Sequence, residues 1–321
     1  MGRYIIRRVL WVALVMLIVT FFAFLIFYVM PTADAATIFA GRQPTPETIA
    51  EVRKQFGLDK EWYEQYGKFV SDIVTGDEYG WPGFNMSYAT RAPIRETIFD
   101  RVGVTFQLAV GAAVLWLAIG IPIGIVSAIR KGKMPDRIGM GFALFGVSAP
   151  VFWLGIMSLF IFWHKLQWTP GTGYVPFGED PGEWFGHMIL PWGVLSMLYA
   201  AVYARMVRSN LLETMGEDYI RTARAKGLKE SRVIGKHGLR ASLTPVVTMI
   251  GLDFGVLLGG AVVTESVFNM NGLGSFLINS VRVGDLPSVT AVIVFAAFFV
   301  TFLNLIVDIV YAYLDPRVRY A

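Results

Sequence analysis

The chain has 321 residues, of which 55% are hydrophobic and only 16% are charged, and its formal net charge is +4. This composition excludes an ordinary soluble domain and is typical of an integral membrane protein. The sequence contains no cysteine, which excludes disulfides, thiolate nucleophiles and iron–sulfur centres.

Six stretches are long and apolar enough to cross a bilayer, which needs about 20 residues of helix. In chain order they are Val9–Met30, Val102–Ile129, Ile138–Trp163, Met188–Met206, Leu243–Val263 and Val289–Leu314. The first stretch resembles a signal peptide, but it is longer than the usual apolar core of one, so we expect a retained helix. The sequence therefore predicts an all-α integral membrane protein with six transmembrane helices.

The positive charges predict how these helices are oriented, because Lys and Arg accumulate on the cytoplasmic side of a membrane. Most of the 28 Lys and Arg residues lie before the first span, after the second, after the fourth and after the sixth. Both termini are therefore expected in the cytoplasm, with the chain crossing a plasma membrane several times. The net charge follows from this topology and requires no nucleic-acid partner.

The polar segment of residues 31–101 predicts a small helical domain on the outer side. Thr45 and Pro46 can begin one helix, and a second helix with apolar residues at helical spacing runs from Trp62 to a stop at Gly76. We expect the apolar faces of the two helices to pack on each other and on the membrane surface rather than to hold a ligand.

The segment of residues 208–242, between the fourth and fifth spans, concentrates Arg and Lys around a short helix. Asp218 is expected to be the N-cap of a helix over Tyr219–Lys226, and Gly227 its left-handed C-cap. Ala223 and Ala225 leave room for close approach to another protein. A short capped helix tied at both ends to transmembrane helices moves as one rigid element, so it can transmit the motion of a partner.

The ordinary alternative is a positively charged loop that lies on anionic lipid, as cationic loops often do. The capped helix favours docking on a soluble partner. The residues expected to take part are Asp218, Tyr219, Arg221, Thr222, Ala223, Arg224, Ala225, Lys226 and Gly227.

Long motifs along the chain resemble a known family. They are YIRTARAKGLKESRV in the cytoplasmic segment, MGRYIIRRVL at the start, FGLDKEWYEQYGKFV in the outer segment, SAPVFWLGI in the third span and NLIVDIVYAYLDPRVRY near the end. Together they closely resemble the permease subunits of bacterial ABC importers for dipeptides and oligopeptides, a group that includes nickel permeases. The stretch GDEYGWPGFNMSY, residues 76–88, departs from the shorter turn usual in that family.

The resemblance implies the type I ABC importer permease fold, in a bacterial inner membrane. It identifies residues 208–242 as the coupling loop that docks on an ATPase, with Gly227 as the invariant glycine of that loop. It also implies the partners: a second homologous permease, two ATP-binding ABC subunits that hold ATP and Mg, an extracytoplasmic substrate-binding protein, and membrane lipid. The implied solute is a di- or oligopeptide, with nickel or another small solute as the alternative.

On this basis we divide the chain into three parts. Residues 1–96 are expected to hold the first transmembrane helix and the outer domain, residues 97–314 the permease domain, and residues 315–321 a cytoplasmic tail.

Acidic residues at membrane depth are costly and therefore functional candidates. Asp253 lies midway along the fifth span and is our candidate for the translocation path, where it would contact the ammonium group of a peptide. The alternatives are an internal hydrogen bond and a neutral, protonated acid that faces the second permease. Asn304 and Asp308 lie toward the inner end of the last span, where we expect pairing with a cytoplasmic arginine such as Arg205.

The sequence has no G-x-x-x-x-G-K-[ST] phosphate loop, no H-E-x-x-H and no G-x-S-x-G. Its three histidines, His164, His187 and His237, are scattered. We therefore expect no catalytic residue and no metal site in this chain, with ATP hydrolysis left to partner subunits. A membrane-embedded aspartyl enzyme using Asp253 and Asp308 is a rival interpretation without a supporting motif, and a sensor without transport would leave the coupling loop unexplained.

Overall fold

The computed structural model describes residues 2–30, 45–55, 59–258 and 261–314. These residues form helices joined by loops and contain no β-strand, which confirms the predicted all-α class. The helices are α1 (Gly2–Phe24) with its π-helical continuation η1 (Leu25–Val29), α3 (Pro46–Gln55), α4 (Trp62–Thr75), α5 (Ile94–Ile129), α6 (Met134–Ser148), α7 (Val151–Ser158) with its continuation η2 (Leu159–Lys165), α8 (Pro181–Thr214), α9 (Asp218–Ala225), α10 (Glu230–Arg232), η3 (Val233–Gly238), α11 (Leu239–Ser242), α12 (Thr244–Leu258), α13 (Val262–Val267), α14 (Leu273–Val283) and α15 (Leu286–Leu314).

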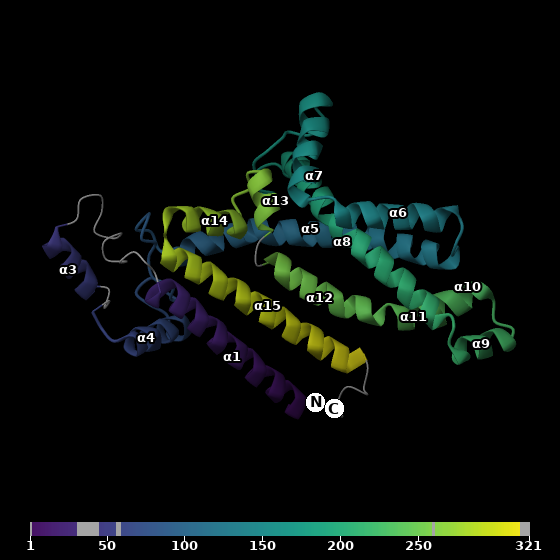
Figure 1. Cartoon of the computed structure of the whole chain (residues 1–321), viewed down its shortest axis with the longest axis horizontal. Coiled ribbons are helices and arrows are strands. Elements are labelled where there is room, and N and C mark those ends of the chain that lie inside the picture. The colour runs from purple at the N-terminus through teal and green to yellow at the C-terminus, as the bar shows by residue number, and fades with distance from the viewer. Residues whose placement is uncertain (1, 31–44, 56–58, 259–260, 315–321) are drawn as a thin grey trace.

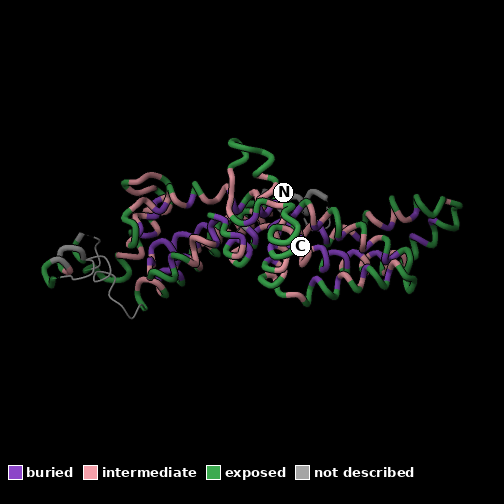
Figure 2. Tube along the Cα trace, turned by 90° about the horizontal axis from the view of Figure 1, so that it is seen from above, coloured by how far each residue is buried: buried purple, intermediate pink, exposed green. Residues whose placement is uncertain are grey.

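The long helices α5 and α8 pack along each other and form the body of the molecule together with α12 and α15 (Figure 1). Helices α3 and α4 lie at one end, and α9 and α10 lie at the other. Buried residues follow the interior of this body from end to end (Figure 2). The 36 residues of α5 correspond to a length of about 54 Å, so this helix extends beyond a hydrocarbon core of about 30 Å.

Four described helices are long and apolar enough to cross a membrane singly, namely Tyr4–Val29, Ile94–Ile129, Pro181–Thr214 and Leu286–Ile306. Two bent pairs, Met134–Ser148 with Val151–Lys165 and Glu230–Ser242 with Thr244–Leu257, raise the number to six if each pair is one span. The six predicted stretches all overlap these segments.

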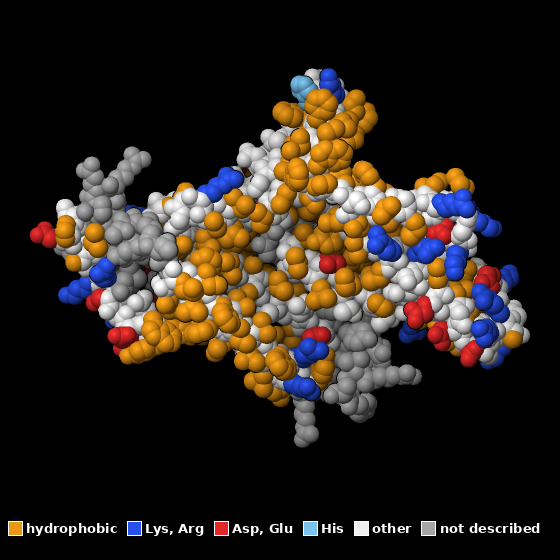
Figure 3. Space-filling model, in the orientation of Figure 1, with side chains coloured by type: hydrophobic (Ala, Val, Ile, Leu, Met, Phe, Trp, Pro, Cys, Tyr) orange, Lys and Arg blue, Asp and Glu red, His pale blue; other side chains and the backbone are white. Residues whose placement is uncertain are grey.

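The third predicted span, Ile138–Trp163, is wrong as a single straight helix, because α6 and α7 with η2 meet at an angle of 102°. Pro150 lies at the bend, and a proline disfavours helical backbone in the residue before it. Ala149 accordingly has extended torsions, φ −79° and ψ 126°. Helix α7 therefore projects from the body, and apolar side chains cover its surface (Figure 3).

The fifth predicted span, Leu243–Val263, is only partly one helix. Helix α12 ends at Leu258, and α13 begins at Val262 after a break. The two glycines at positions 259 and 260 lie outside the described residues. The inner end of α12 is also bent by 44° from the preceding segment.

A buried carboxylate fixes the connection between α13 and α14. The Glu265 side chain, 0% exposed, accepts hydrogen bonds from the Thr105 hydroxyl of α5 at 2.8 Å and from the Ser275 backbone N–H at 2.8 Å. Gly272 leaves the space for it, since a Cβ there would lie 2.5 Å from the carboxylate. We call Thr105, Glu265, Gly272 and Ser275 the Glu265 cluster. It fixes the start of α14 to the N-terminal half of α5.

A second buried carboxylate ties the outer loop to the corner between α14 and α15. Asp285 accepts hydrogen bonds from the Ser87 hydroxyl (2.6 Å), the Tyr88 backbone N–H (2.8 Å) and the Ser288 hydroxyl (2.6 Å). Burial, with the nearby Asp285 charge, raises the pKa of Tyr88 to about 12, so its phenol stays neutral beside the carboxylate. The predicted outer segment is therefore anchored to the last helix.

Asp308 pairs with an arginine, as predicted, but the partner is Arg8 of the first helix and not Arg205, the example named. The Arg8 guanidinium lies 2.9 Å from the Asp308 carboxylate, and the Tyr4 hydroxyl donates to the Asp308 carbonyl at 3.4 Å. Helix α1 packs along α15, and this alignment places its arginine beside the inner end of the last helix. Periodicity within one helix cannot identify such a partner.

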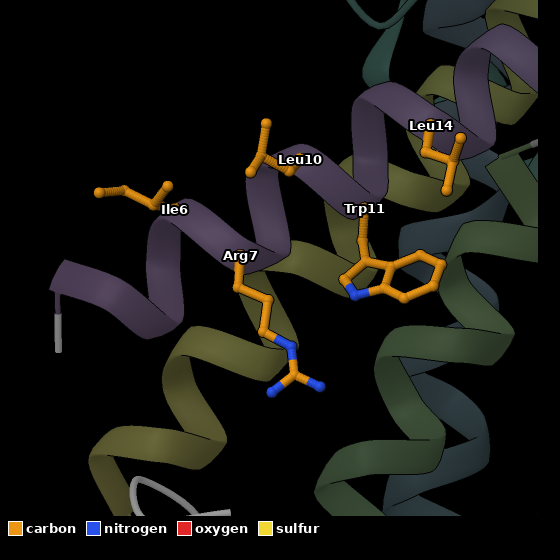
Figure 4. Close-up of a pocket in the computed structure, with 5 residues that line it drawn as sticks. All are labelled: Ile6, Arg7, Leu10, Trp11 and Leu14. Carbon is orange, nitrogen blue, oxygen red and sulfur yellow. The ribbon is translucent and has the colours of Figure 1, made fainter.

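The open side of α1 carries a shallow apolar hollow of about 360 Å³ (Figure 4). Its lining residues are Ile6, Arg7, Leu10, Trp11 and Leu14. A lining that is apolar apart from one arginine suits lipid chains better than a polar solute, so we do not treat it as the functional site.

Candidate functional site

Helix α9 begins one residue earlier than predicted. Glu217 has extended torsions and precedes the helix, and its side chain makes no capping hydrogen bond. Asp218 is therefore the first helical residue and not the N-cap, which corrects the sequence prediction. Its carboxylate lies 3.2 Å from the Arg221 guanidinium, one turn along the helix, and a negative charge in the first turn stabilises a helix.

The end of α9 is closed by Gly227 in left-handed conformation, φ 74°, as predicted. The Gly227 N–H donates to the Arg224 carbonyl at 2.9 Å, and the Leu228 N–H donates to the Ala223 carbonyl at 3.4 Å. This pair of bonds is a Schellman motif, which satisfies two carbonyls that the helix leaves free. A Cβ at Gly227 would meet no atom within 4 Å, so the glycine is required by its backbone conformation and not by space.

One face of α9 packs against its own chain. Ile220 (0% exposed) and Ala223 (7%) contact Val233 of η3, and Met215 and Leu228 border this small core. Ala223 therefore belongs to this small core and is not available for close approach to a partner. Ala225, in contrast, is exposed. This contact joins α9 to η3, which begins the segment that leads into α12.

The other face of α9 is exposed and charged. Within the described part of the chain, Arg221 pairs with Asp218, and the two side chains are 72% and 95% exposed. Arg224 forms two hydrogen bonds to the exposed Glu230 carboxylate, the shorter at 2.7 Å. Exposed pairs of this kind are weak and can be exchanged for a partner's carboxylates. Figure 3 shows Lys, Arg, Asp and Glu side chains gathered over this end of the molecule, in contrast to the apolar middle.

The segment behind α9, made of η3 and α11, is packed closely onto the C-terminal end of α8. A Cβ on the buried Gly238 would lie 3.0 Å from the Met215 sulfur and 3.2 Å from Leu211. The Asn210 side chain reaches the Ser242 carbonyl at 3.4 Å. Because α9 packs on η3, we expect a displacement of α9 to move α8, on which η3 packs. We expect it also to move α12, which follows η3 and α11 in the chain.

An ion pair that sequence reasoning missed joins the inner ends of α6 and α8. Arg208 donates to Asp136 through two nitrogens, at 2.6 and 2.8 Å, and the Gly132 N–H also donates to that carboxylate at 2.8 Å. Asp136 is only 4% exposed. A signal existed in the sequence, since Asp136 is the one acidic residue among the basic residues that follow the second span.

Asp253 lies on α12 where it meets α5 and α8. The Tyr203 hydroxyl donates to its carboxylate at 2.8 Å. Trp116 of α5 stacks on Tyr199 of α8, with ring centroids 4.7 Å apart, and lies 5.9 Å from the Tyr203 ring. Asp253 is half-buried, and its contact with Tyr203 is the internal hydrogen bond expected as one alternative.

The predicted coupling residues and Asp253 do not form one site. Helix α9 lies at the end of the molecule, whereas Asp253 lies in its body. Among the described residues, no group of three His, Asp or Glu side chains could hold a metal ion.

Two family models match the chain. The N-terminal model of binding-protein-dependent transport system membrane components covers residues 1–109, and the model of the binding-protein-dependent transport system inner membrane component covers residues 120–320. Full-length relatives include a peptide transport system permease protein of Brucella abortus (strain 2308) and the glutathione transport system permease protein GsiC of Escherichia coli (strain K12). Each is 38% identical over 320 residues, which is 100% of both chains.

A solved structure shares the fold. It is the MetNI methionine ABC transporter in an inward-facing conformation, which matches with a TM-score of 0.57 and 18% identity over 70% of this chain and 98% of that one. At this identity the likeness concerns the fold alone, which is that of a type I ABC importer permease. The chain belongs to the family of binding-protein-dependent transport system inner membrane components, which are transport proteins and not enzymes.

Proposed function

We propose that this chain is one of two permease subunits of an ATP-driven peptide importer, and that α9 is its coupling helix. The observation that carries the proposal is the construction of α9. Its inner face is buried on Val233, its end is closed by the Gly227 motif, and its outer face is charged and exposed. Because it is held in this way, α9 can be displaced by a partner without unfolding, and its displacement moves α8 and α12 as well.

The complete importer needs partners that this chain lacks. A second permease supplies the other half of the path, two ABC subunits bind ATP and Mg, and an extracytoplasmic binding protein delivers the solute. The inner-membrane family supports this assembly. Both termini lie in the cytoplasm on this interpretation, and the Arg8–Asp308 pair is consistent with that, since it brings the two ends of the chain to the same side.

The proposed solute is a short peptide. The support comes from the full-length relatives, which are named for peptide and glutathione transport. Glutathione is itself a small peptide. We also propose the division of the chain given by the sequence, with the outer domain in residues 1–96, the permease domain in residues 97–314 with its coupling loop at 208–242, and a short cytoplasmic tail at 315–321.

The test uses the complete complex in proteoliposomes with its binding protein and a labelled tripeptide. The variant Y219A/R221E changes the exposed face of α9 without touching its buried side. We expect the ATPase subunits to be lost on purification and peptide uptake to fall at least about tenfold, as for the loss of central interface contacts. The second permease should be retained.

The matched control is Arg137→Glu, an exposed charge reversal in the first turn of α6, which the proposed topology places on the same side as α9. It should leave uptake near the wild-type rate. Retention of the ATPase subunits by Y219A/R221E would contradict the coupling role of α9. Uptake of nickel, but of no peptide, by the wild-type complex would replace the proposed solute.

A further inference from the structure

Asp253 differs from three other acidic side chains that lie buried or half-buried within helices. Asp136 is paired with Arg208, Asp308 with Arg8, and the fully buried Glu265 accepts two hydrogen bonds. Among the described contacts, Asp253 receives only the Tyr203 hydroxyl, on one of its two oxygens. No Lys, Arg or His of the described residues lies within ion-pair distance of it.

Such a group is expensive to keep in a membrane protein without a purpose. An aspartate that only supported the fold would be expected to have its second oxygen occupied, as both oxygens of Asp136 and of Glu265 are. Asp253 is instead half-buried, with the exposed residues Leu252 and Val256 beside it on α12. One oxygen is thus held in position by Tyr203, and the carboxylate keeps the capacity to accept from another donor.

The surroundings of this carboxylate are aromatic and fixed. Trp116 and Tyr203 are both 0% exposed, and Tyr199 lies one turn from Tyr203 on α8. The helices that carry these rings approach closely at Gly120, where a Cβ would lie 2.8 Å from the Ala200 carbonyl oxygen. The rings therefore form a rigid wall on one side of Asp253.

A carboxylate beside aromatic rings is suited to a primary ammonium group. The carboxylate accepts a charge-assisted hydrogen bond from N⁺–H, and the ring of Tyr199, which is half-buried whereas Trp116 and Tyr203 are fully enclosed, can attract the same cation. A divalent metal ion would need further oxygen or nitrogen ligands, and no such group of three is found among the described residues.

We propose that Asp253, with the wall formed by Trp116, Tyr199 and Tyr203, is a transient binding site for the N-terminal ammonium of a peptide in passage. The inference rests on the proposed function as a peptide importer. Because only one oxygen is free and the site is open on one side, binding is weak, as a transport step requires. The site acts after the binding protein has released its peptide.

The experiment measures uptake of a labelled tripeptide by the complete complex in proteoliposomes, at saturating loaded binding protein. Asp253→Asn has the shape of aspartate and keeps an acceptor for Tyr203, but it carries no charge. We expect uptake to fall about tenfold, the effect of losing a charge-assisted hydrogen bond. ATP hydrolysis and recovery of the assembled complex should stay near wild type, and Asp253→Glu should restore most of the uptake.

A second probe separates the charge from a structural role. The same tripeptide acetylated at its N-terminus has no ammonium, so its uptake, compared at equal occupancy of the binding protein, should be the same in wild type and Asp253→Asn. Unchanged tripeptide uptake by Asp253→Asn overturns the inference, and so does an equal loss for both peptides. A wild-type complex that takes up no peptide would instead refute the proposed function.

Discussion

Two regions of this molecule hold their short helices in different ways. In the region of α13 and α14, which we call the outer end because the proposed topology places it outside, the helices are fixed by Glu265 and Asp285, which are 0% and 3% exposed and accept hydrogen bonds from side chains and backbone. At the other end, α9 is fixed by the Gly227 backbone motif and an apolar contact, while its ion pairs lie on the surface. Removing a partner from a buried carboxylate is costly, whereas surface pairs can be exchanged. The outer end is therefore expected to keep one shape, and α9 to offer its charges to an incoming protein.

The largest effect is expected at the Glu265 cluster. Glu265→Ala leaves the Thr105 hydroxyl and the Ser275 N–H without their acceptor and opens a cavity. We expect a loss of about 3 kcal/mol or more in the free energy of unfolding. Thermal unfolding of the purified complex and hydrogen exchange across α14 measure it. Glu183→Ala removes a carboxylate that is 56% exposed and should have no comparable effect. Equal stability of the two variants would contradict the contrast between the ends.

An intermediate effect is expected at Gly227. Valine in a left-handed conformation costs about 1–2 kcal/mol, so Gly227→Val should fray α9 and reduce peptide uptake more than it reduces ATP hydrolysis. The ratio of peptide imported to ATP hydrolysed is the measurement.

Two controls accompany Gly227→Val. Gly235→Val lies in the same segment, has open space around it and requires no left-handed backbone. Gly132→Val imposes the same backbone strain, φ 77°, in the turn between α5 and α6. If the Gly132 variant lowers the transport ratio equally, the effect belongs to strain in general and not to α9.

The smallest effect is expected at the surface pair of α9. Glu230→Ala removes the partner of Arg224 on side chains that are 55% and 42% exposed, so the thermal stability of the complex should not change measurably. Binding of the ATPase subunits should be retained, since Arg224 becomes free to pair with them. A marked loss of stability would show that this end depends on its ion pairs as the outer end does.

Local sequence features predicted the parts of the structure that depend on neighbouring residues. The glycine at 227 marked the end of α9, and the start of α3 at Pro46 and the extent of α4 to Gly76 followed from the same rules. The N-cap was placed one residue late because Asp218 fits the first turn of a helix as well as it fits the capping position.

Features that depend on packing between helices were not predictable. Glu265 and Thr105 are 160 residues apart, and Arg208 and Asp136 are 72 apart, so their meeting depends on how α5, α6, α8 and α13 pack. Pro150 marks the bend in the sequence, but the apolar residues on both sides of it suggested one continuous span. The sequence identified Asp253 only by its position midway along a predicted span. The aromatic rings around it are brought together by the packing of α5, α8 and α12, which the sequence did not show.

The Arg8–Asp308 pair has a consequence for biosynthesis. Helix α1 leaves the ribosome long before α15, the helix against which it packs. Helix α1 therefore lies in the lipid, without the Asp308 partner of its Arg8, while the rest of the chain is inserted. We expect α1 to become protected from protease and crosslinkers only when residue 308 has emerged, which truncated nascent chains can show. Early protection would mean that another helix holds α1 first.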